Sequence, residues 1–223
     1  MKKLLLVAAV VGTLPFAANA ESTLSSAASG AVSATARLDF IVTVPKVLFL
    51  QVGTGTAGAT IDKLGTNGTV NDMTFAVPAG SIGTGATTGA IAATGGDLAG
   101  GGVTVRVFGN SGNVSLSNAT TGQLSSGTAG NPTIPWTDIS VTTGTLATAT
   151  SGYSNAAIAH PPFNNASGGG VSATPTSLTA TNGLVRREGS WSFAYANTAM
   201  LPSGTYGNTV ANNGTVTYTA TAP

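Results

Sequence analysis

The stretch from Leu38 to Gly53 constrains the fold most, because it is the longest concentration of apolar side chains after the first twenty residues. Its first half has apolar side chains at every second position, namely Leu38, Phe40, Val42 and Val44. Strand side chains alternate between faces, so these four share one face of a predicted half-buried β-strand. The following run, Val47–Leu50, is apolar throughout and predicts a strand covered on both faces by a second sheet or another subunit. Pro45 cannot donate a ladder hydrogen bond, so we expect one long N-terminal strand that is broken once.

Residues 1–20 have the pattern of a secretory signal peptide. Lys2 and Lys3 precede a short apolar run, and small residues stand at Ala18 and Ala20. A basic start, an apolar middle and a small-residue site together predict export with cleavage after Ala20. A retained membrane anchor is the alternative, but the apolar run is shorter than the ~20 residues that a span requires. We therefore exclude residues 1–20 from the fold and expect no membrane span after cleavage.

The chain after Ala20 carries few charges. It has six basic and seven acidic residues, so its formal charge is −1, against +1 for the full chain. The pair Arg186–Arg187 is the only basic cluster, which argues against nucleic-acid binding, because phosphate neutralisation needs clustered Lys and Arg. Weak repulsion between copies leaves self-association less opposed than usual. With no cysteine, disulfides and thiolate metal sites are excluded, and we expect neither a metal nor a cofactor.

Strand patterns recur along the rest of the chain, and no convincing amphipathic helix is present. Alternating or strand-like apolar runs occur at 73–77, 103–116, 134–141, 191–195 and 215–221. The run at 103–116 surrounds a Gly/Asn turn and predicts a β-hairpin. The segment 142–177 is poor in large apolar residues and is predicted to be a long loop with at most short strands. Together these features predict an all-β fold, an antiparallel β-sandwich with long Gly/Thr-rich loops.

Two features that could indicate a cofactor site or a catalytic site lack the surrounding residues that such sites need. Gly53–Gly58 matches G-x-G-x-x-G, but the residues that follow lack the apolar period of the helix that would hold a pyrophosphate. His160 is the only histidine, and a triad with Asp138 and a serine is the catalytic alternative. No G-x-S-x-G elbow is present to hold a serine nucleophile. We predict that the chain is not an enzyme.

Aromatic residues offer a second functional hypothesis. Trp136 is a candidate for stacking on a sugar, in which case the chain would be a secreted carbohydrate-binding β-sandwich module that does not polymerise. Trp191, Phe193 and Tyr195 alternate, and such a pattern is more often a core face than a ligand platform. The threonines of the predicted last strand, Thr215, Thr217, Thr219 and Thr221, predict an ordinary solvent-facing surface.

Several features taken together resemble the secreted fimbrial subunits of Gram-negative bacteria, the chaperone–usher pilin group in a broad sense. They are the signal peptide, the early apolar stretch with PKVLFLQVG, the lack of helices, and the ending PSGTYG followed by NGTVTYTATAP. The resemblance covers mainly Val32–Gly53 and Trp191–Pro223. It implies an incomplete immunoglobulin-like sandwich whose groove accepts an N-terminal strand donated by a neighbouring subunit.

The resemblance also implies partners, a location and interface residues. Residues 21–36 are either a flexible leader or the donor extension, and residues 37–223 form a single domain. The candidate interface residues are Val32, Ala34 and Ala36 in the donor, Leu38 and Phe40 after it, and Val216 and Tyr218 beside the groove. Expected partners are copies of the same chain or other surface subunits, a periplasmic chaperone and an outer-membrane usher. We therefore expect a non-catalytic structural or adhesive subunit that passes through the periplasm to a fimbria-like fibre at the cell surface.

Overall fold

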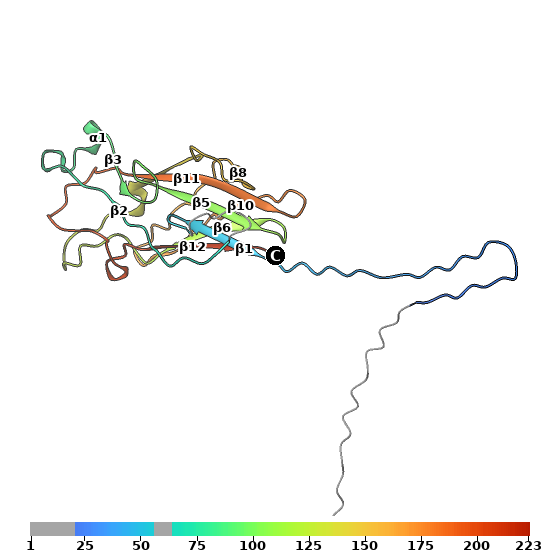
Figure 1. Cartoon of the computed structure of the whole chain (residues 1–223). Helices are drawn as coiled ribbons and strands as arrows, with labels where there is room; N and C mark the ends of the chain where they lie inside the picture. The colour runs from blue at the N-terminus through green and yellow to red at the C-terminus, as the bar shows by residue number, and fades with distance from the viewer. Residues whose placement is uncertain (1–20, 56–63) are drawn as a thin grey trace, which may run out of the picture. The chain divides into compact units, whose positions relative to one another are not determined.

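The computed structural model describes residues 21–55 and 64–223 (Figure 1). The predicted signal peptide and the second half of the G-x-G-x-x-G motif lie outside the described residues. The chain divides into two units, Met1–Pro45 and Lys46–Pro223, and each is described by itself. The unit boundary therefore follows Pro45, whereas the sequence predicted that the β domain begins at residue 37.

The first sheet of the second unit is built around β11 (Val185–Tyr195). On one side β11 pairs with β5 (Gly102–Gly109) and β3 (Ile91–Ala92), and β5 pairs in turn with β1 (Leu48–Val52). On the other side it pairs with β7 (Ile139–Gly144) and β8 (Ser154–Asn155). All of these pairs are antiparallel except β8 with β11.

The second sheet is built around β6 (Val114–Thr120). It pairs with β12 (Val216–Thr221) on one side and with β9 (Gly170–Val171) and β10 (Thr176–Leu178) on the other. A small third sheet joins β2 (Met73–Thr74) to β4 (Thr94–Gly95). The described helical segments are short: α1 (Gly85–Thr88) and 3-10 turns at Ala79–Ser81, Trp136–Asp138 and Val210–Asn212. The predicted all-β antiparallel sandwich with long loops is confirmed.

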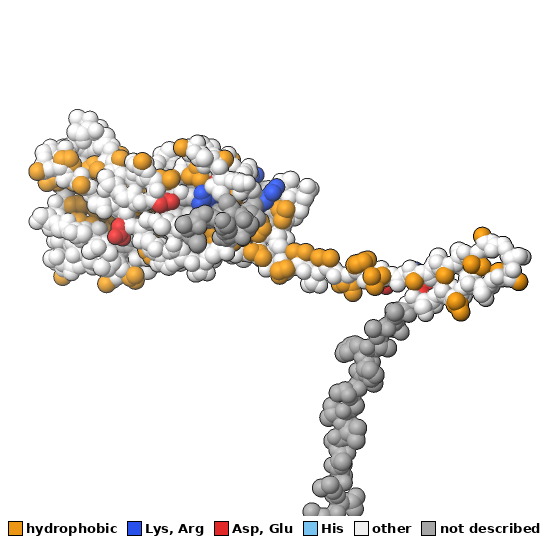
Figure 2. Space-filling model, viewed as in Figure 1, with side chains coloured by type: hydrophobic (Ala, Val, Ile, Leu, Met, Phe, Trp, Pro, Cys, Tyr) orange, Lys and Arg blue, Asp and Glu red, His pale blue; other side chains and the backbone are white. Residues whose placement is uncertain are grey.

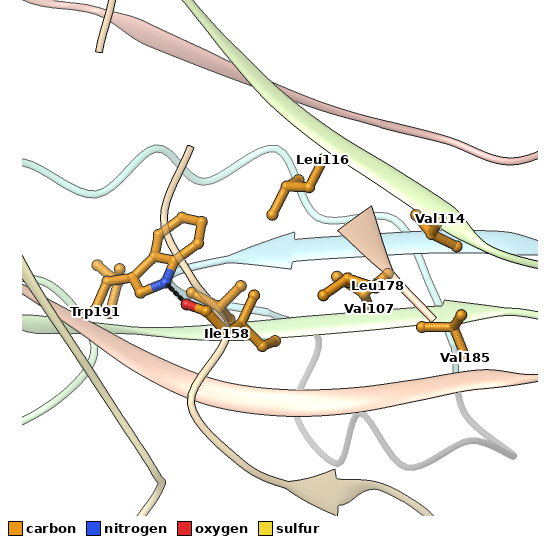
Figure 3. Packing of buried hydrophobic residues seen from close by; sticks show 9 residues of the cluster. Val107, Val114, Leu116, Ile158, Leu178, Val185 and Trp191 are labelled. Atoms are coloured by element: carbon orange, nitrogen blue, oxygen red, sulfur yellow. Dashed lines mark hydrogen bonds between the residues drawn. The ribbon is translucent and has the colours of Figure 1, made fainter. Parts of the chain in front are cut away.

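The core lies between these two sheets, as Figure 3 shows. β5 and β11 contribute buried side chains from one sheet, and β6 and β10 contribute them from the other. Its buried members are Val103, Val105, Val107, Val114, Leu116, Ile158, Leu178, Val185 and Trp191. Trp191 Nε1 donates a hydrogen bond of 2.7 Å to the Ile158 carbonyl, which satisfies the polar atom of a fully buried ring. This core confirms the interpretation of the alternating aromatics of β11 as a core face.

The predicted hairpin at 103–116 is wrong, although both of its strands exist. β5 belongs to the first sheet and β6 to the second, so the connection between them crosses the sandwich instead of closing a hairpin. The reason is burial: Val105 and Val107 on β5 and Val114 and Leu116 on β6 are all fully buried in one core. Two strands paired edge to edge in one sheet would not cover each other's apolar faces, whereas strands in opposite sheets do.

The predicted long N-terminal strand is also wrong in its first half. Residues 38–47 form no strand, and β1 begins only at Leu48. Leu48 is exposed and Phe49 and Leu50 are half-buried, so this run is not covered on both faces as predicted. The ladder explains this boundary, because Leu48 pairs with Gly109, the last residue of β5. The sheet therefore ends where β1 begins, and residues before Leu48 have no neighbouring strand in their own unit to pair with.

The remaining strand predictions hold in outline. The segment 142–177 is mostly loop with the short strands β8 and β9, as expected. The predicted run at 134–141 contains a 3-10 turn, and its strand starts at Ile139. β12 forms at the C-terminal end with Thr217, Thr219 and Thr221 exposed, as expected. Thr215 differs from the prediction, because it precedes β12 and is half-buried.

A buried ion pair ties three strands together. The Glu188 side chain is fully buried on β11 and accepts hydrogen bonds from Arg106 Nε on β5 at 3.0 Å and from the Thr150 amide at 2.5 Å. Arg106 also donates to Gln51 Oε1 on β1 at 3.1 Å and to Thr150 Oγ1 at 2.8 Å. Because each polar partner is satisfied, the cost of burying the two charges is offset.

We predict that Arg106→Met destabilises the fold by about 3–5 kcal/mol, because it leaves a buried carboxylate without its counter-charge. Urea unfolding of wild type and variant measures the change in the free energy of unfolding. Arg186→Met is the matched control, since Arg186 is an exposed arginine on β11. Equal stability of the Arg106 and Arg186 variants would contradict the structural role of the pair.

Candidate functional site

An open cleft lies over one face of β7, the strand at an edge of the first sheet that pairs only with β11 among the described strands. It has a volume of about 420 Å³. One wall is formed by β7 and the 3-10 turn before it, and the other by the segment 159–163. The lining residues are Trp136, Thr137, Ile139, Val141, Thr143, Ala159, His160, Pro162 and Phe163. None of these side chains carries a formal charge at neutral pH, so the cleft is suited to an uncharged, largely apolar occupant.

The segment 159–163 is held in place by the second sheet and by β11. Asn118 on β6 is buried and donates from Nδ2 to the Pro161 carbonyl at 2.5 Å and to the Pro162 carbonyl at 3.3 Å. The hydrogen bond from Trp191 to Ile158 anchors the chain just before it. These bonds explain how a segment without regular structure forms a defined wall of the cleft.

His160 lies at the base of this wall among aromatic rings. Its Nε2 is 2.7 Å from the Tyr218 hydroxyl, and its ring makes edge contacts with Trp191 and Phe163 at centroid distances of 4.6 Å each. The hydrogen-bond partner of the imidazole is thus a phenol on β12. Asp138, the carboxylate of the triad alternative, forms no hydrogen bond with His160 among the described residues.

Burial controls the protonation of both members of this pair. Removal from water lowers the pKa of His160 to about 4, from the usual 6.5, because the low-dielectric surroundings disfavour the imidazolium. Burial likewise raises the pKa of the Tyr218 hydroxyl well above its usual value, because it disfavours the phenolate. Both groups are therefore neutral at physiological pH, and the pair contributes a hydrogen bond without a charge.

Trp136 is 6% exposed, so little of its ring is available for stacking on a ligand. Its Nε1 donates to the Gly122 carbonyl at 2.6 Å, and its ring packs against Phe163 at a centroid distance of 4.8 Å. Sugar-stacking platforms present an open aromatic face, and this ring is instead part of the second core cluster, with Ile134, Ile139 and Tyr195.

The candidate interface residues near the N-terminus are exposed. Val32, Ala34 and Ala36 lie in a loop of residues 21–37 that two contacts close. Thr23 Oγ1 donates a hydrogen bond of 2.8 Å to the Thr35 carbonyl, and Glu21 forms an ion pair with Arg37 at 2.6 Å. Beyond this closed loop, the four residues with the shared apolar face remain open to solvent. Their exposed fractions are 76% for Leu38, 84% for Phe40, 85% for Val42 and 73% for Val44.

Val216 and Tyr218, the candidates on β12, are packed inward instead. Val216 packs against the second core cluster, and Tyr218 packs against the first, where its ring lies 5.1 Å from that of Trp191. The structure brings Tyr218 together with His160 and the cleft. Sequence reasoning missed the cleft, because the alternation at Ile139, Val141 and Thr143 does not reveal which sheet edge stays free.

No group of three or more acidic or histidine side chains suited to a metal ion occurs among residues 21–55 and 64–223. In the same part of the chain, no helix has the length and apolar character needed to cross a membrane. No protein-family model, curated protein or solved structure matches the chain.

We predict that the stability of the fold falls as the pH drops from 6.5 towards 4. Over this range the unfolded chain binds a proton at His160 that the folded chain, with its lower pKa, excludes. At roughly 1.4 kcal/mol per pKa unit, the loss between pH 7 and pH 5 is about 2 kcal/mol. Urea unfolding at the two pH values measures it.

The matched control is His160→Gln, which keeps a polar end but cannot titrate. Its free energy of unfolding should change less between pH 7 and pH 5 than that of the wild type. An identical pH dependence in the two proteins would show that His160 is not buried in its neutral form.

Proposed function

We propose that the chain is a non-catalytic, exported structural or adhesive subunit that self-associates by donating an N-terminal strand to another copy. One observation carries this proposal: Leu38, Phe40, Val42 and Val44 form a regular apolar face that is at least 73% exposed at every position. Exposed hydrophobic residues scattered singly are common, whereas a contiguous exposed face marks an interaction site. In Figure 2 hydrophobic side chains lie uncovered along this segment.

The pattern of the segment favours pairing as a strand. Covering each of these side chains is favourable by roughly 1.5–3 kcal/mol, and a period of two presents all four to the same partner. Pro45 follows the last of them and ends the segment, because it has no N–H for a ladder. No backbone hydrogen bond within the described chain involves residues 38–44, so their main-chain groups are available for a partner strand.

The proposed donor lies later in the chain than the resemblance implies. The resemblance assigned donation to residues 21–36, where Val32, Ala34 and Ala36 offer small side chains. Residues 38–44 supply larger ones with the same alternation, and they belong to the first unit. The closed loop of residues 21–37 then precedes the donor and is not part of its apolar face.

We predict that the double substitution Phe40→Ser with Val42→Ser abolishes self-association of the mature chain. Removing two buried apolar side chains from an interface raises the dissociation constant by more than about tenfold. Light scattering coupled to size-exclusion chromatography measures the mass of the assembly, and negative-stain microscopy shows whether fibres form.

The matched control is Ile41→Ser, which removes an equally exposed apolar side chain from the opposite face of the segment. This variant should assemble as the wild type does. Assembly by the Phe40 and Val42 variant, or monomeric wild type at all concentrations, would refute strand donation by this segment.

A further inference from the structure

We infer that the acceptor of this donated segment is the free edge of β7 together with the cleft beside it, on a second copy of the chain. The inference rests on the proposed function and specifies its partner surface. It follows from three properties of the edge: free main-chain groups, an apolar cleft lined by the same strand, and the absence of charge.

The ladder between β7 and β11 determines which main-chain groups of β7 are free. The Ala196 amide donates to the Asp138 carbonyl at 2.8 Å, in line with the pairing of Ala194 with Ser140. Hydrogen-bonded pairs alternate in an antiparallel ladder, so Ser140 and Thr142 bond to β11. Val141 and Thr143 then direct their N–H and C=O groups away from the sheet, and no backbone partner for them is found within the described chain.

The same two residues present their side chains to the cleft. Ile139, Val141 and Thr143 share one face of β7, and all three line the cleft. A strand added to this edge would therefore satisfy the free main-chain groups and place every second side chain against Phe163, Pro162 and the β7 face. Both features serve one incoming strand, which is the geometry of strand addition.

The proposed donor matches this edge in length, pattern and charge. β7 spans six residues, Ile139–Gly144, and the donor is the seven-residue stretch from Leu38 to Val44. The donor face has no charged side chain and neither does the cleft, so pairing buries no unpaired charge. The charged Asp39 alternates with the apolar face and would point outward to water.

The opposite side of the sandwich is closed to a donor. There β1 of the first sheet and β12 of the second approach within 8 Å between Cα atoms. A strand inserted between two others as part of one ladder needs them about 9.5 Å apart, twice the usual strand spacing. In addition, Val216 and Tyr218 of β12 already pack against the core clusters. The groove beside the terminal strand, which the resemblance implied, is thus less suited than the β7 edge.

Cross-linking between two single-cysteine proteins tests the acceptor, since the natural chain has no cysteine. A protein with Phe40→Cys or Val42→Cys is mixed with a protein carrying Thr143→Cys and oxidised. Facing side chains on paired strands are close enough for a disulfide, so a mixed dimer is expected. The control donor is Ile41→Cys, and the control acceptor is Thr219→Cys, which is exposed on β12. Neither control should cross-link above the level of random collision.

Val141→Pro provides a second, independent test. The substitution removes an outward N–H at an edge position, where proline is tolerated, so the fold should persist by circular dichroism. The protein concentration needed for assembly should rise at least about tenfold, because the ladder to the donor loses a hydrogen bond and the proline ring obstructs the incoming strand. If the wild type assembles but Val141→Pro assembles equally well and Thr143→Cys does not cross-link, the β7 acceptor is refuted while strand donation stands. A wild type that stays monomeric refutes both.

Discussion

The arrangement of the molecule depends on where the first sheet ends. β1 pairs with β5 only from Leu48 onward, because β5 finishes at Gly109. The alternating apolar residues from Leu38 to Val44 form no ladder and stay exposed. An exposed apolar segment with the pattern of a strand is unfavourable in a monomer, because water contacts its apolar surface. Burying the same surface between two copies would contribute binding free energy.

The core of the sandwich includes no side chain of that segment. It is enclosed by β5 and β11 on one side and β6 and β10 on the other, with Trp191 satisfied by the Ile158 carbonyl. The Arg106–Glu188 pair ties β1, β5 and β11 together through buried hydrogen bonds. The proposed donor is thus separate from the core of the sandwich, whereas the proposed acceptor, β7, packs against that core. Substitutions on residues 38–44 should therefore affect assembly without unfolding the β unit.

The sequence predicted the fold class and most strands, because alternation with a period of two reports local burial directly. It did not predict which strands pair. The runs in β5 and β6 looked like a hairpin, yet the demand for cover on both apolar faces placed them in opposite sheets. Alternation at Leu38–Val44 predicted a strand that the structure does not contain, because whether such a segment pairs and is covered depends on neighbours far away in the sequence. The β7 edge and its cleft could not be predicted from the sequence for the same reason, since a free edge is a property of the whole sheet.

Hydrogen exchange at the backbone amides of residues 38–44, compared between dilute and concentrated mature protein, tests the central claim most directly. Strand donation predicts fast exchange when the chain is dilute and strong protection of alternate amides when it assembles, because the ladder forms only between copies. Fast exchange of these amides at every concentration, in a sample that has visibly assembled, would contradict the account.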